Sequence, residues 1–166
     1  MRIKAIVYTS NTGFTARYAA LLGERAGLPV WELSQAKGGL ERREDVLYLG
    51  WLCAGGIKGL KKARRLFHVR VVCAVGIAPP ESGMLTTIAE RNQTGELPLF
   101  YLRGGYDGTA LRGIHRLMMS FMEKTMAAAK DQDPQAREML DAVQNGADWV
   151  EPEQLKPILT WLEGER

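Results

Sequence analysis

Short apolar runs alternate with helical segments along most of the chain, and this alternation restricts the possible folds more than any other feature. Runs typical of buried strands cover residues 2–8, 30–33, 45–52, 70–77 and 97–102. Helical patterns cover residues 16–26, 58–68, 84–91 and 109–129. Because each gap between strands is long enough for a crossover, we predict a parallel sheet with helices on both faces.

Five strands in 166 residues fit an α/β fold with a doubly wound, five-stranded parallel sheet in the order 2-1-3-4-5. We expect one domain over residues 1–166, with a core at about 1–129 and a C-terminal helical extension at about 130–166. Short helices are predicted at 134–143 and 152–162 in that extension. Ligands of such sheets bind at the carboxyl ends of the strands, which directs attention to the loops after strands 1, 3 and 4.

Composition excludes several classes of protein. The formal charge of +3 is weakly basic and does not indicate nucleic-acid binding, which needs a clustered basic face. No run approaches the ~18 apolar residues that cross a bilayer, so no membrane span is expected. The first residues lack the pattern of a secretory signal, which predicts a cytoplasmic location. Cys53 and Cys73 lie in apolar runs and are expected to be free thiols, and neither histidine has metal-site spacing.

The loop after the first strand carries the clearest chemical signal. It contains Thr9, Ser10, Asn11, Thr12, Gly13, Phe14 and Thr15, and a helix follows it. Hydroxyl groups and the backbone N–H groups of a helix N-terminus can together bind an anion, and glycine permits a close approach of the backbone. The loop has no lysine or arginine, a composition suited to a phosphate monoester. The alternative is that its hydroxyls only cap the helix.

Three other phosphate-binding motifs are absent. The chain lacks the Gly-x4-Gly-Lys-Ser/Thr motif of nucleoside triphosphatases and, after the first strand, the Gly-x-Gly-x-x-Gly motif of dinucleotide sites. A Cys-x5-Arg phosphatase loop needs arginine where the chain has Gly59 and Pro79.

The segment Ser10-Asn11-Thr12-Gly13-Phe14-Thr15 resembles the Thr/Ser-x-Thr-Gly-x-Thr phosphate loop of the flavodoxin family. The resemblance extends over residues 1–125, roughly. It implies an FMN-binding electron-transfer protein in which residues 10–15 bind the phosphate of the cofactor. We include Thr9 in the predicted site because it begins the same loop.

The same resemblance assigns the flavin ring to the loops after strands 3 and 4. The residues that it implies there are Trp51, Leu52, Cys53, Ala54, Gly55, Gly56, Gly76, Ile77, Ala78 and Pro79. Trp51 either stacks on the ring or belongs to the core. Gly55 or Gly56 allows a peptide rearrangement near the flavin. The loop after strand 4 lacks the aromatic residue common in the family. One face of the flavin ring is therefore open, or it is covered by a proline or by a later segment.

Two functions remain open, with a third less favoured. The first is electron transfer with a redox partner protein, and the second is an FMN-dependent dehydrogenase of protoporphyrinogen or quinone type. The third is an interaction domain without cofactor. No dedicated catalytic residue is expected. A small carboxylate-bearing substrate can bind the basic residues Lys58, Lys61, Lys62 and Arg65, unless these only form a solvated helix face.

Two features beyond the fifth strand complete the expectations. Arg103 and Asp107 can line the rim of the site, or this segment is only a turn in which Asp107 caps the long helix. The apolar stripe of that helix is predicted to be core that packs against the sheet, and its members are Leu111, Ile114, Met118, Phe121 and Met126.

Overall fold

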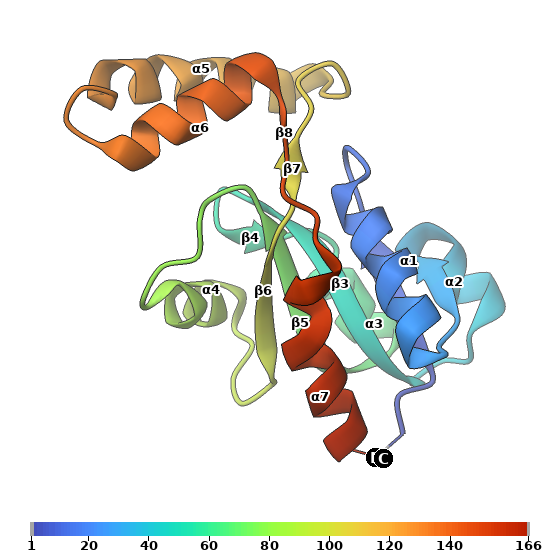
Figure 1. The fold of residues 1–166 in the computed structure, drawn as a ribbon. Coiled ribbons are helices and arrows are strands. Elements are labelled where there is room, and N and C mark those ends of the chain that lie inside the picture. The colour runs from blue at the N-terminus through green and yellow to red at the C-terminus, as the bar shows by residue number, and fades with distance from the viewer. Residues whose placement is uncertain (1, 166) are drawn as a thin grey trace.

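Five parallel strands form the centre of the fold in the computed structural model, which describes residues 2–165 (Figure 1). Their order in the sheet is β2-β1-β3-β5-β6, which is the predicted doubly wound arrangement of the five strands. They are β1 (Ala5–Thr9), β2 (Val30–Glu32), β3 (Asp45–Cys53), β5 (His68–Gly76) and β6 (Leu99–Arg103). A sixth strand, β4 (Gly56–Ile57), was not predicted and pairs antiparallel with the end of β3.

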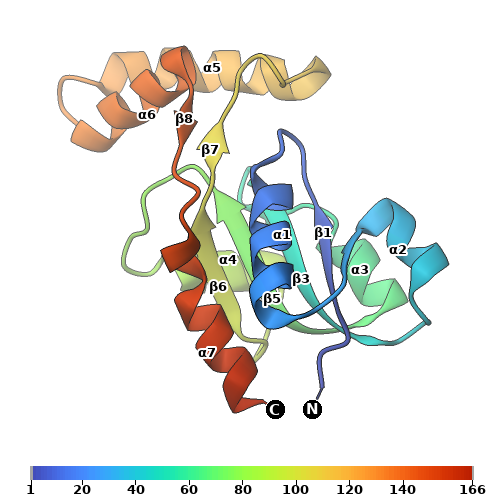
Figure 2. The same ribbon diagram turned by 45° about the vertical axis from the view of Figure 1, so that its right-hand side comes forward.

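Helices cover both faces of the sheet (Figures 1 and 2). One face carries α1 (Phe14–Ala26), the 3-10 helix η1 (Pro152–Leu155) and α7 (Lys156–Gly164), which share a core with Ile6 and Leu47. The other face carries α2 (Leu33–Gly39), α3 (Leu60–Leu66) and α4 (Met84–Asn92), which share a core with Val7 and Tyr48. Because both faces are covered, alternate strand residues are buried on opposite sides, which explains the nearly continuous apolar runs.

The long helix α5 (Gly113–Ala129) does not pack against the sheet. It forms a hairpin with α6 (Pro134–Asn145), and both views show this hairpin beyond the sheet, joined to it by the strand pair β7 (Gly105–Tyr106) and β8 (Ala147–Asp148) (Figures 1 and 2). No residue of α5 is buried, and Phe121 is 74% exposed. The prediction that the apolar stripe is core against the sheet is therefore wrong.

The reason for this difference lies at the other end of the chain. The sheet face beside α1 is already covered by α7, whose Ile158 is fully buried. After β6 the chain continues beyond the carboxyl edge of the sheet, where β7 pairs antiparallel with β8. Thus the segment that stands apart is the α5–α6 hairpin, whereas the C-terminal residues complete the core.

The start of α5 also differs from the prediction. The Asp107 carboxylate accepts hydrogen bonds from the Thr109 backbone N–H at 2.9 Å and from the Thr109 hydroxyl at 2.6 Å. This Asx turn closes the loop four residues before the helix begins at Gly113. Asp107 therefore stabilises a turn and does not cap the helix.

Hydrogen bonds and ion pairs at the base of the hairpin fix its position. The Tyr18 hydroxyl donates to the Arg103 carbonyl at 2.6 Å, and the Gln154 amide donates to the Trp149 carbonyl at 2.7 Å. An ion pair of 2.7 Å joins Arg17 of α1 to Asp148 of β8. The strand pair below α5 and α6 is thus tied to both α1 and η1. No helix in residues 2–165 has the length and apolarity to span a membrane.

Candidate functional site

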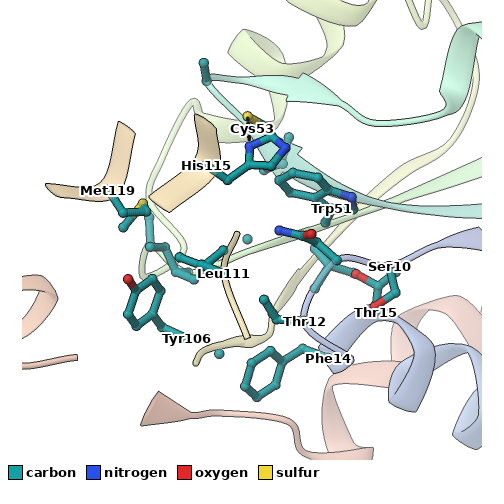
Figure 3. Close-up of a pocket in the computed structure, with 18 of the residues that line it drawn as sticks. Ser10, Thr12, Phe14, Thr15, Trp51, Cys53, Tyr106, Leu111, His115 and Met119 are labelled. Carbon is teal, nitrogen blue, oxygen red and sulfur yellow. Dashed lines mark hydrogen bonds between the residues drawn. The ribbon is translucent and has the colours of Figure 1, made fainter. Parts of the chain in front are cut away.

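A cavity of about 350 Å³ lies at the carboxyl ends of β1, β3 and β5 and beneath α5. Its size falls within the ~300–1,000 Å³ of small-molecule sites. No aspartate, glutamate, lysine or arginine belongs to the lining among the described residues. Figure 3 shows side chains from α1, from the end of β3 and from α5 converging on this space. The location agrees with the edge at which doubly wound sheets bind ligands.

The structure brings together most of the residues predicted to bind the cofactor. The cavity is lined by Ser10, Asn11, Thr12, Phe14, Thr15, Trp51, Leu52, Cys53, Ala54, Gly76, Ile77 and Ala78. The remaining predicted residues, Thr9, Gly13, Gly55, Gly56 and Pro79, lie next to these in sequence but are not part of the lining.

The N-terminus of α1 supplies polar groups at one end of the cavity. The preceding residue, Gly13, has a φ of 101°, and no side chain in the described part of the chain caps the helix. The backbone N–H groups of Phe14, Thr15 and Ala16 have no hydrogen-bond acceptor within residues 2–165. Among the described residues, the Ser10 hydroxyl oxygen accepts a hydrogen bond only from the Gly13 N–H, at 3.2 Å. The loop hydroxyls therefore do not act as the helix cap, and the unpaired amides can bind an anion.

Thr9 points away from the cavity. Its hydroxyl lies 2.8 Å from the Tyr48 hydroxyl, which donates to the Lys58 carbonyl at 2.7 Å. Tyr48 is fully buried, and its burial raises the pKa of the phenol to about 12, although the Thr9 hydrogen bond acts in the opposite direction. This cluster connects the end of β1 to the loop after β4 behind the cavity wall.

Burial of Tyr48 predicts a loss of stability in alkali. The raised pKa means that the folded state favours the neutral phenol. The resulting stabilisation of the folded state is present below pH 10 and is lost as the pH rises to about 12. Two pKa units correspond to about 3 kcal/mol at most. We expect Tyr48→Phe to be less stable at neutral pH, because it loses two hydrogen bonds. Between pH 10 and 12, however, the variant should lose less further stability than the wild type. Urea unfolding at several pH values measures this, and parallel pH profiles of the two proteins would contradict the assignment.

The end of β3 forms a tight hairpin that the sequence did not predict. Cys53 pairs with Gly56, and the two residues between them have positive φ, 48° for Ala54 and 76° for Gly55. Positive φ at both central positions is typical of a type I′ turn, which more often contains Asn-Gly or Asp-Gly. The Asn92 side chain holds this turn, since its amide donates to the Gly55 carbonyl at 2.9 Å and its oxygen accepts the Ile57 N–H at 2.7 Å.

Aromatic side chains occupy several sides of the cavity. Trp51 lines it and meets the His115 ring edge-on, with centroids 5.1 Å apart and planes at 79°. Phe14, Tyr101 and Tyr106 also belong to the lining, and sequence analysis had assigned none of the tyrosines to the site. The Tyr101 hydroxyl donates to the Ala78 carbonyl at 2.6 Å, and burial raises its pKa, so this phenol stays neutral.

Helix α5 covers the cavity opposite the sheet. It contributes His115, Met118, Met119 and Met122, and Leu111 precedes it. These residues were missed because the stripe was interpreted as core. A signal existed in the sequence: positions 115, 118, 119 and 122 share one helix face, where the histidine interrupts an otherwise apolar pattern. The loop after β5 contributes no aromatic side chain to the cavity, and a later segment, α5, covers it.

The basic residues considered as carboxylate ligands do not line the cavity. Lys61, Lys62 and Arg65 are exposed on α3, which covers a face of the sheet. Arg103 forms an ion pair with Glu138 at 2.7 Å, and its guanidinium lies 3.7 Å from the centre of the Trp149 ring. Arg103 therefore connects β6 to α6 of the hairpin and to Trp149, which follows β8.

The described residues contain no group of three His, Cys, Asp or Glu side chains that could hold a metal ion, and both cysteines are free thiols. Comparisons of the chain with protein-family models, with curated proteins and with solved structures give no match.

Proposed function

We propose that the protein binds FMN in this cavity and acts as an oxidoreductase. The observation that carries the proposal is the uncapped N-terminus of α1 at one end of a cavity whose other walls are apolar and aromatic. FMN has a matching arrangement of polar and apolar parts, with a phosphate dianion at one end and a flat ring at the other. The amides of α1 and the hydroxyls of Thr12 and Thr15 would bind the phosphate.

The ring would lie between the end of β3, with Trp51, and the loop after β5. Bound FMN supplies the hydride and electron-transfer chemistry. The chain's own contribution is to orient the ring and, through α5, to exclude water from it. Within residues 2–165, no lysine or arginine belongs to the lining, so the flavin ring would meet no permanent cation of the lining.

Between the two functions left open by the sequence, the cover provided by α5 favours a dehydrogenase over a carrier. A carrier exposes the ring edge to its partner protein, whereas here Leu111, His115 and Met119 lie over the cavity (Figure 3). The lining also favours a neutral, flat substrate of quinone type over a carboxylate-bearing porphyrinogen, because no lysine or arginine of the described chain is present there to pair with a carboxylate.

The first test is the visible absorption spectrum of the purified protein before and after addition of FMN. We expect stoichiometric binding, with the flavin spectrum shifted by transfer into an apolar site. Bound FMN is then reduced chemically and mixed with either a short-chain quinone or a small redox protein. Faster reoxidation by the quinone supports the dehydrogenase. A protein that takes up no FMN would contradict the proposal as a whole.

A further inference from the structure

The two cysteines of the chain lie in opposite environments. Cys73 is fully buried within β5, and burial raises the pKa of its thiol, which keeps it neutral and unreactive. Cys53 is partly exposed at the end of β3 and lines the cavity. A reagent that enters the cavity therefore meets the thiol of Cys53 and not that of Cys73.

Cys53 is paired with an imidazole from a distant part of the chain. Its Sγ lies 3.9 Å from Nδ1 of His115, within the reach of a hydrogen bond to sulfur. The edge-on contact with Trp51 restricts the imidazole ring from its other side. Figure 3 shows the thiol and the ring close together among the residues that line the cavity. The imidazole is thus in place to take the proton from the thiol.

Two cations lie beside residues next to this pair. The Lys58 ammonium lies 5.8 Å from the centre of the Trp51 ring, and the Arg91 side chain packs against Gly55 in the hairpin turn. Neither cation forms an ion pair within residues 2–165. Among the residues that the structure describes, no carboxylate lines the cavity.

We propose that Cys53 is a thiol-exchange site that reacts with small disulfides and is activated by His115. The imidazole accepts the thiol proton, and the Cys53 sulfur attacks one sulfur of the disulfide. A new S–S bond forms as the old one breaks, and the released half leaves as a thiolate that takes the proton from His115. Cys53 is oxidised to a mixed disulfide and the small disulfide is reduced to one equivalent of thiol.

This modification would control access to the cavity. Cys53 lines the cavity, so the attached group fills space that a ligand needs. A reducing thiol reverses the reaction by the same exchange, which restores the free cavity. The inference concerns the chain's own residues and stands independently of which ligand the cavity takes.

The test uses the full chain without added flavin, treated with oxidised glutathione or iodoacetamide. Mass spectrometry of peptides gives separate rates for Cys53 and Cys73 between about pH 5 and pH 9. We expect Cys53 to react faster than an unactivated thiol, and Cys73 to remain unmodified in the folded protein. His115→Gln is expected to slow the reaction of Cys53 about tenfold at neutral pH.

Met126→Leu is the matched control, because Met126 lies on the same helix but is not part of the cavity lining. We expect its rate to equal that of the wild type. Equal rates and pH profiles for His115→Gln and the wild type would overturn the proposal, as would a wild-type Cys53 no faster than an unactivated thiol. Added FMN tests the proposed function separately, since a bound flavin is expected to slow the reaction at Cys53.

Discussion

Replacing Ile158 with alanine is expected to lower the free energy of unfolding by about 2–5 kcal/mol, whereas Ile114→Ala should change it by about 0.5 kcal/mol or less. Both positions are isoleucines in helices, but Ile158 is fully buried against α1 and the sheet, and Ile114 is 68% exposed on α5. The first substitution leaves a cavity in the core, whereas the second removes contacts mainly with water.

Urea unfolding of the two variants and the wild type measures this difference, with circular dichroism as a check that each variant folds. The pair separates the two interpretations of the long helix. A stripe that packs against the sheet requires a large loss for Ile114→Ala, so a comparable loss at both positions would contradict the placement of α5.

The second large effect concerns binding of FMN at the N-terminus of α1. We expect the double substitution Thr12→Ala and Thr15→Ala to weaken the binding free energy of FMN by about 3–6 kcal/mol, since each hydrogen bond to a charged group contributes about 1.5–3 kcal/mol. This corresponds to a rise in Kd of roughly 100-fold to 10,000-fold. Both threonines line the cavity, and Thr15 is only 2% exposed. Titration of the variant with FMN, followed by flavin fluorescence, measures the change.

Thr9→Ala is the control for this experiment. Thr9 ends the strand that leads into the same loop, but its hydroxyl is bonded to Tyr48 and lies outside the cavity. Thr9→Ala should therefore leave the Kd for FMN unchanged and reduce stability by about 0.5–1.5 kcal/mol. An unchanged Kd in the double variant would remove the loop from the binding site.

Local patterns in the sequence were sufficient to predict the sheet and one end of the candidate site. The apolar runs of the five parallel strands reflect burial on both faces, so each run can be identified without knowing its neighbours. The loop at residues 10–15 could be located because hydroxyl residues, a glycine and a helix N-terminus are adjacent in sequence. The β4 hairpin escaped prediction because Ala54 takes a positive φ that is stabilised by Asn92, a residue far along the chain.

The sequence by itself determined the strands, their crossover connections and the polar loop, because these depend on residues close together in the chain. Only the tertiary structure decided which helix covers which surface. An amphipathic pattern shows that α5 has an apolar face, but not what that face meets, since α7 from the end of the chain already covers the sheet. The cavity beneath α5 and the contact of Cys53 with His115, 62 residues away, follow from that placement. Such contacts join distant segments, and no periodicity within either segment encodes them.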